Sequence, residues 1–172
     1  KALLCKSLGL PDTLVYEDVP DPVPGPGQVL VEMRAAGVNF PDVLMIQGKY
    51  QFKPPLPFAP GAELAGVVLA LGAGVGNVKV GDRVAYASPT PGAYTDERVL
   101  PVANLVPVPE GVSDRLAAAA LLKGMTAQVL LRRTYKVRKG SVVVVHAAAG
   151  GVGSILVQWA LHLGARVIAV VG

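Results

Sequence analysis

The chain has 172 residues, of which 52% are hydrophobic and 16% charged, and its formal net charge is +4. This length suffices for one good core or two small domains, and the composition is that of a rather apolar globular protein. The single cysteine excludes an internal disulfide, and no basic start leads into an apolar run, so we expect no secretory signal peptide and a reducing, cytoplasmic setting.

The first hundred residues alternate short apolar runs with turns. These runs predict strands at residues 2–6, 14–18, 29–36, 64–71, 83–87 and 93–100. Turn-rich segments separate them, above all PDPVPGPG at 20–27 and a proline-dense loop at 54–60. Pro41, with Asp42 after it, can open a short helix that runs to Ile46, because proline fits the first helical turn. The sequence therefore predicts a β-rich domain with irregular connections.

The composition changes after the segment VPVPEG at 106–111. There SDRLAAAALL begins, a run of strong helix formers that Ser113 or Asp114 can cap, and a second helical run spans residues 125–135. We therefore expect a β domain at 1–111 and the start of an α/β domain at 112–172.

Five basic residues follow closely in the segment LRRTYKVRKG at 131–140. We interpret this segment as a solvated helix end, and we expect contact with neither nucleic acid nor a membrane.

The last segment, residues 141–172, has the pattern of a βαβ unit. Four consecutive valines at 142–145 predict a strand buried on both faces. The turn AAAGGVG at 147–153 leads into apolar positions at helical spacing, which end at Gly164, and a second strand is expected at 167–171. A membrane span is rejected because polar residues and clustered glycines interrupt the apolar stretch.

The glycine turn is the strongest chemical signal. Gly150, Gly151 and Gly153 lie where a strand meets the start of a helix, so that backbone N–H groups and the helix dipole can hold a pyrophosphate. A tight turn without a ligand remains the alternative. Residues 154–172 contain no Asp or Glu, and Val171 and Gly172 occupy the place where an NAD site puts its acid, which favours NADP.

Six segments together resemble the medium-chain dehydrogenase/reductase superfamily, most closely its zinc-free NADPH:quinone oxidoreductases, the branch that includes zeta-crystallin. They are AAGVNFPD at 35–42, PGAELAGVV at 60–68, VGDRVAY at 80–86, GAYTDERVL at 92–100, LLKGMTA at 121–127 and HAAAGGVG at 146–153. The resemblance implies a GroES-like β-rich domain followed by the first βαβ unit of a Rossmann doubly wound parallel sheet, with the active site in the cleft between the domains.

Zinc is not expected. A catalytic zinc needs three protein ligands, and the chain has one cysteine and two histidines. In the zinc alcohol dehydrogenases the similar motifs carry a cysteine where this chain has Asn39 and a histidine where it has Ala62. Glu63 is retained, either with a functional role or as an ordinary strand-end carboxylate.

The resemblance assigns Asn39 and Tyr50 as donors that stabilise negative charge on the acceptor oxygen when hydride leaves NADPH for a quinone or an enone. It assigns Asp42 to hold the first loop in shape. Alternatively, Asn39 is a turn residue, Tyr50 a surface aromatic and Asp42 a helix cap.

The resemblance also implies that Lys123 and Thr126 face the cofactor, although a lysine at a helix junction commonly faces solvent. The remaining cofactor contacts inferred from the turn and the second strand are Ala149, Gly150, Gly151, Val152, Gly153, Val171 and Gly172.

A complete doubly wound domain has about six strands, and this sequence predicts only the first two. We therefore expect a truncated domain with an apolar strand edge that, taken alone, is poorly soluble or dimeric and nearly inactive. For the whole protein we expect a homodimeric NADPH:quinone oxidoreductase. The alternatives are an enoyl- or acryloyl-thioester reductase of the same fold and a non-catalytic, crystallin-like nucleotide-binding protein.

Overall fold

The computed structural model describes residues 1–172, which form two compact units, Lys1–Ala119 and Ala120–Gly172. The domain boundary expected at residues 111 and 112 stays a prediction.

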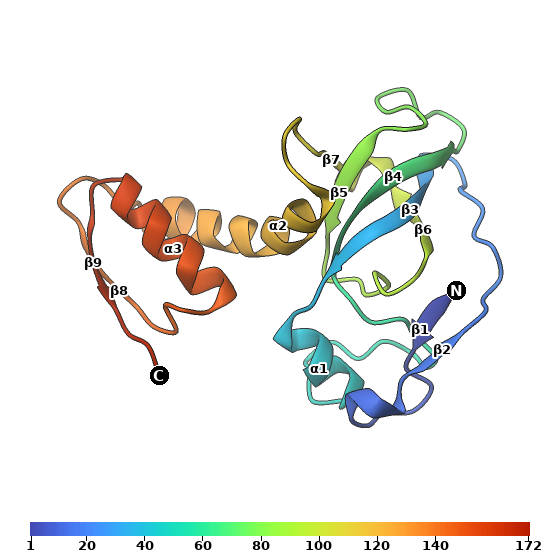
Figure 1. Cartoon of the computed structure of the whole chain (residues 1–172), viewed down its shortest axis with the longest axis horizontal. Coiled ribbons are helices and arrows are strands. Elements are labelled where there is room, and N and C mark those ends of the chain that lie inside the picture. Colours follow the sequence, from blue (N-terminus) through green and yellow to red (C-terminus); the bar gives the residue numbers. More distant parts are fainter. The chain divides into compact units, whose positions relative to one another are not determined.

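The first unit is built on a five-stranded antiparallel sheet with the strand order β6-β3-β4-β5-β7 (Figure 1). The strands are β3 (Gln28–Gly37), β4 (Glu63–Leu71), β5 (Arg83–Ala87), β6 (Glu97–Pro101) and β7 (Val106–Pro107). A separate antiparallel pair is formed by β1 (Ala2–Leu4) and β2 (Val15–Glu17). Helix α1 (Phe40–Ile46) follows β3, and single 3-10 turns lie at Pro11–Thr13 and Val102–Asn104.

The alternation of apolar residues along the strands explains the core of this unit. Val29 and Val31 of β3, two residues apart, point to the same face and are fully buried with Leu64 and Val68 of β4. A smaller core is formed by Met45 and Ile46 of α1 together with Cys5 and Phe58. The loop between β3 and α1 is therefore anchored by packing at both ends.

The strand predicted at 93–100 begins later than expected, at Glu97. Ala93 and Tyr94 instead donate their backbone N–H groups to the carbonyls of Gly61 and Pro60 at 3.1 and 3.0 Å. This turn cannot continue the ladder with β3, because its donors are used by the loop before β4.

The two helical runs expected between residues 113 and 135 form one continuous helix, α2 (Asp114–Gln128), which ends in a π-helical segment at Val129–Thr134. Gly124 does not interrupt it. The five basic residues of the 131–140 segment are all exposed, as expected for a solvated helix end.

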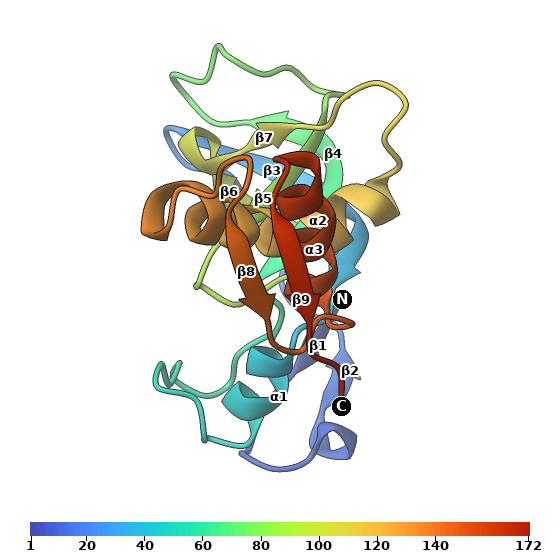
Figure 2. The same ribbon diagram turned by 90° about the vertical axis from the view of Figure 1, so that its left-hand side faces the viewer.

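The second unit contains the predicted βαβ arrangement. Strand β8 (Val142–Val145) pairs in parallel with β9 (Arg166–Ala169), and helix α3 (Gly151–His162) joins them (Figure 2). The core of this unit combines Leu131, Val137, Ala160 and Ala165 with half-buried side chains of α3 and both strands.

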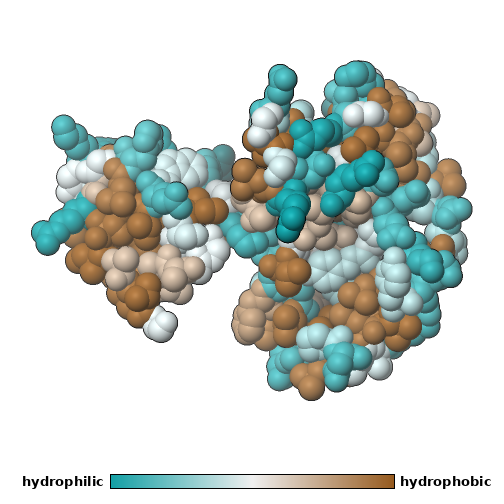
Figure 3. Space-filling view, viewed as in Figure 1, coloured by the Kyte–Doolittle hydropathy of each residue, from teal (hydrophilic) through white to brown (hydrophobic).

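Two expectations for this unit are wrong. Val142 and Val144 are 60% and 55% exposed, because α3 covers only one face of the two-stranded sheet. The second strand ends at Ala169, so that Val171 and Gly172 lie beyond it. Apolar side chains consequently gather on the surface of this unit (Figure 3). No helix in the protein combines the length and the apolar character that crossing a membrane would require.

Candidate active site

Asn39 sits at the junction between β3 and α1. Its backbone is extended (φ −130°, ψ 151°), which makes it the N-cap of α1. Its backbone N–H donates to Oδ2 of Asp42 at 2.8 Å, and the N–H of Asp42 donates to the Asn39 carbonyl at 3.0 Å. The alternative that Asp42 is the helix cap needs correction, because the N-cap residue is Asn39. Asp42 is the third helical residue and bonds back to the capping residue, as the acid of a capping box does.

The side chain of Asn39 is held from the neighbouring strand. Its amide nitrogen Nδ2 donates to Oε1 of Glu63 at 2.9 Å, and Glu63 is fully buried. The β3–β4 register sets Gly37 opposite Glu63, and a Cβ at position 37 would overlap the Glu63 carboxylate. Glycine two residues before Asn39 therefore makes room for the carboxylate that orients the amide.

The carboxylate of Asp42 is buried, with 3% of the residue exposed, and one of its oxygens accepts two hydrogen bonds. Its Oδ2 accepts from the Asn39 backbone and from the hydroxyl of Tyr94 at 3.0 Å, whereas Oδ1 has no hydrogen-bond partner. Burial raises the pKa of Asp42, and the nearby charge of Glu63 adds to this, while the backbone N–H groups of Asn39 and Gly61 and the hydroxyl of Tyr94 lower it. Burial and the Asp42 charge likewise raise the pKa of Tyr94, so its hydroxyl stays protonated and donates.

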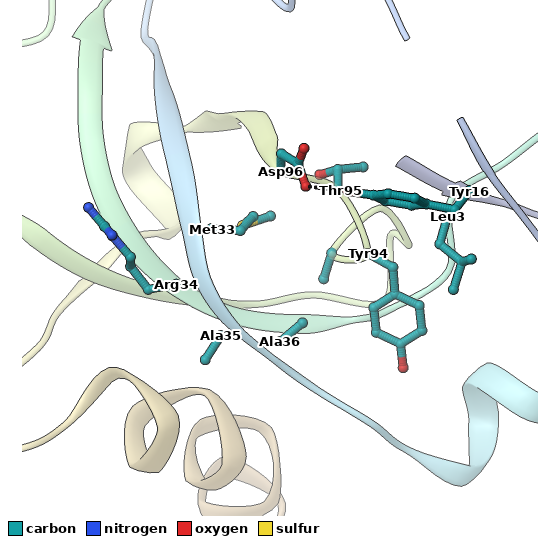
Figure 4. A pocket seen from close by; sticks show the side chains of 10 residues that line it. Leu3, Tyr16, Met33, Arg34, Ala35, Ala36, Tyr94, Thr95 and Asp96 are labelled. Atoms are coloured by element: carbon teal, nitrogen blue, oxygen red, sulfur yellow. Dashed lines mark hydrogen bonds between the residues drawn. The ribbon is translucent and has the colours of Figure 1, made fainter. Parts of the chain in front are cut away.

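Tyr94 is the residue of this site that sequence reasoning missed. Its ring lies against Gly61, whose φ of +91° favours glycine and where a Cβ would be 2.6 Å from ring carbons of Tyr94. Tyr94 is one of the residues that line a pocket of about 380 Å³. Figure 4 shows its hydroxyl directed away from Tyr16 and Asp96. Two glycines in the sequence could have indicated this role: Gly61, against which the Tyr94 ring packs, and Gly92, two residues before Tyr94.

Tyr50 is separated from Asn39 by the whole length of helix α1. Asn39 precedes α1 and Tyr50 follows it, at the other end of a helix that is about 10 Å long. Tyr50 packs against the small core of Cys5, Met45, Ile46 and Phe58, and its N–H donates to the Leu44 carbonyl at 3.2 Å.

The glycine turn of the second unit is closely packed. Gly150 is the N-cap of α3, and its N–H donates to the Ala147 carbonyl at 2.9 Å. A Cβ on Gly153 would overlap that same carbonyl, so only glycine allows α3 to approach the turn this closely. Residues 151–153 begin α3, where the first N–H groups of a helix lack intrahelical partners and can face an anion.

Several predicted cofactor residues lie around this turn. The Lys123 side chain runs past Gly151, where a Cβ would be 2.8 Å from its Cδ atom. The hydroxyl of Thr126 donates to the Leu122 carbonyl at 2.9 Å. The N–H of Ala148 donates to the Val170 carbonyl at 3.0 Å, which places the end of the chain, Val171 and Gly172, directly after a residue bonded to the turn.

Comparison with known proteins agrees with this architecture. Residues 25–110 match the alcohol dehydrogenase GroES-like domain family. A quinone oxidoreductase of Pseudomonas aeruginosa is 46% identical over 99% of this chain and 52% of its own length. A 2-haloacrylate reductase of a Burkholderia species is 46% identical over 95% of this chain and 50% of its own length. The Escherichia coli quinone oxidoreductase, solved in complex with NADPH, superposes with a TM-score of 0.94 at 38% identity, covering 99% of this chain and 52% of that one.

The chain belongs to the medium-chain dehydrogenase/reductase superfamily. Within the superfamily it falls in the quinone oxidoreductase branch, as the sequence motifs indicated. The expected fold class, a GroES-like β domain followed by a Rossmann βαβ unit, is confirmed. The chain spans about half the length of the curated relatives it matches.

Proposed function

We propose that the whole protein is an NADPH-dependent oxidoreductase that reduces a quinone or another activated double bond without zinc. The observation that carries this proposal is the side-chain amide of Asn39, held on the buried carboxylate of Glu63 at 2.9 Å. In the zinc alcohol dehydrogenases, whose motif the segment around Asn39 resembles, a cysteine that binds zinc stands at the position of Asn39. An amide is a poor zinc ligand and a good hydrogen-bond donor.

The proposed role of Asn39 follows from this contact. An amide nitrogen carries two hydrogens, and Glu63 accepts one of them. The second would be donated to the acceptor oxygen, where negative charge develops during reduction, and a preorganised donor of this kind stabilises such charge. Asp42 would keep the backbone of this loop fixed, and Tyr50 would contribute a second donor near the far end of α1.

NADPH fits the second unit. The glycine turn leaves no side chains at Gly150 and Gly151, α3 presents its N-terminus, and the Lys123 side chain runs beside the turn. Bound there, the cofactor would supply the hydride. Val171 and Gly172 add no carboxylate that would repel a 2′-phosphate. The mycobacterial and Escherichia coli neighbours, both solved with NADPH, support this choice. Thr126, Ala149, Val152 and Gly153 complete the proposed contacts.

A second candidate function is reduction of an unsaturated acid or thioester. It is favoured by the 2-haloacrylate reductase relative and by a solved enoyl reductase with a TM-score of 0.91 at 29% identity. A non-catalytic nucleotide-binding role is the third candidate. We further propose that the whole protein is a cytoplasmic homodimer that binds small molecules and neither nucleic acid nor membranes.

The decisive experiment measures NADPH and NADH oxidation by the full-length protein with benzoquinone, 2-chloroacrylate and crotonyl-coenzyme A as separate acceptors. We expect NADPH-dependent reduction of the quinone that resists a zinc chelator, and a loss of about 100-fold in kcat for Asn39→Ala. Preference for the acrylate or the thioester would assign the second function. NADPH binding without turnover of any acceptor would overturn both enzymatic functions.

A further inference from the structure

A chain of hydrogen bonds links four residues from separate parts of the β unit. Tyr94 donates to Asp42 at 3.0 Å, Asp42 accepts from the Asn39 backbone at 2.8 Å, and the Asn39 amide donates to Glu63 at 2.9 Å. Tyr94 precedes β6, Asp42 belongs to α1 and Glu63 opens β4. Asn39 is therefore fixed from two sides, at its backbone and at its side chain.

Tyr94 is held in this chain by its own surroundings. Its backbone N–H donates to the Pro60 carbonyl, and its ring rests on Gly61, two residues before Glu63. The loop at 60–61 thus locates Tyr94, and the strand that follows the same loop locates Glu63. The segment at residues 60–63 therefore fixes the position of both side chains that hold the Asn39 loop.

The hydroxyl of Tyr94 stabilises the negative charge of the buried Asp42 carboxylate. Asp42 is almost fully buried, its Oδ1 is unpaired, and the titratable groups that face it are Glu63 and Tyr94. Without the Tyr94 hydroxyl, only the backbone N–H groups of Asn39 and Gly61 would be left to stabilise the Asp42 carboxylate. A buried carboxylate that loses a donor is more readily protonated, and in that form it holds the Asn39 backbone less firmly.

We propose that Tyr94 is a positioning residue: its hydroxyl keeps the buried Asp42 carboxylate on the Asn39 backbone, so that the Asn39 amide stays on Glu63 with its second hydrogen directed at the acceptor oxygen. This inference rests on the proposed function of Asn39 as a donor. Tyr94 itself touches neither substrate nor cofactor in this role.

The test is Tyr94→Phe in the full-length protein, which removes the hydroxyl and keeps the ring on Gly61. We expect kcat with the quinone to fall about tenfold, as for loss of a hydrogen bond to a charged group, while KM for NADPH is unchanged. The acid limb of the pH profile of kcat should move to higher pH, because loss of the Tyr94 hydrogen bond raises the pKa of Asp42. A purely structural role of the hydroxyl would not move that limb.

The matched control is Tyr16→Phe. Tyr16 also donates its hydroxyl to an aspartate, Asp96, at 3.2 Å, but this pair is exposed and lies outside the chain of bonds to Asn39. We expect its kcat and pH profile to equal those of the wild type.

Three outcomes separate this inference from the proposed function. A low kcat and a shifted acid limb in Tyr94→Phe support the inference. A wild-type kcat and pH profile in Tyr94→Phe, combined with a low kcat in Asn39→Ala, overturns it and leaves the function standing. If the wild type reduces no acceptor, the function fails, and a crystal structure of Tyr94→Phe decides: an Asn39 amide turned away from Glu63 supports the positioning role, and an unchanged amide overturns it.

Discussion

Asp42 should make the stability of the protein depend on pH in an unusual direction. Burial raises the pKa of Asp42 in the folded state above its value in the unfolded chain. The folded state therefore binds more protons between these two pKa values, and the free energy of unfolding falls as the pH rises through that window. In Asp42→Asn this fall should disappear, which urea unfolding at a series of pH values will measure.

Asp82→Asn is a control with the opposite sign. Hydrogen bonds and the charge of Lys79 lower the pKa of Asp82 in the folded state. Its stabilising contribution is therefore present above the unfolded pKa and is lost as the pH falls through the folded value. Identical pH dependence in Asp42→Asn and the wild type would contradict the burial argument.

Single residues were predictable where a local motif contained them. The segments around Asn39, Asp42 and Glu63 were recognisable, because each is a short string with a glycine or proline beside a polar residue. Tyr94 lies in the recognised segment 92–100, but no role was predicted for it, because it meets Asp42 across 52 positions of sequence and its segment was interpreted as a strand. Contacts of this kind depend on how loops fold back, which periodicity does not encode.

At the scale of elements, the stability of the start of α3 should depend more on Gly153 than on Gly151. Gly153→Ala places a Cβ against the backbone carbonyl of Ala147, which cannot move without disturbing the turn. We expect a loss of about 1–3 kcal/mol in the free energy of unfolding, as for overpacking. Thermal unfolding of the variant in the absence of cofactor will measure it.

Gly151→Ala is the matched variant. Its Cβ would meet only the flexible side chain of Lys123, which can move away. We expect a much smaller loss of stability but weaker NADPH binding, because the added methyl group enters the proposed pyrophosphate site. Equal melting temperatures for the two variants would show that the approach of α3 to Ala147 is not constrained.

Elements with turn signals at both ends were predicted well from the sequence, and elements of two or three residues or with an interrupted pattern were not. Strands β5 and β8 match their predicted bounds, because apolar residues and turn signals mark both ends. Strand β7 has two residues and the 3-10 turns have three, too few for any period to show. The sequence predicted two helical runs where the structure has the single helix α2, which passes through Gly124, because one glycine costs a helix only about 1 kcal/mol.

On the scale of the whole molecule, the second unit exposes one face of its sheet. Val144 pairs with Ile168 across the two strands, and these side chains are 55% and 46% exposed. Val142 extends the same face, since alternate residues of a strand point the same way. A contiguous apolar patch of this kind promotes association with other apolar surfaces.

We therefore expect the 172-residue chain to associate with itself when it is produced alone. Val144→Lys should shift sedimentation velocity profiles toward the monomer and reduce the binding of a hydrophobic dye, because a charge at the centre of the patch opposes its burial. Val23→Lys is the control, because Val23 is 84% exposed in a loop of the β unit and lies outside the patch. A monomeric wild-type chain that binds no dye would contradict this account, and so would equal effects of the two substitutions. If Val144→Lys alone acts, the exposed face of β8 and β9 is the surface through which copies of the chain meet.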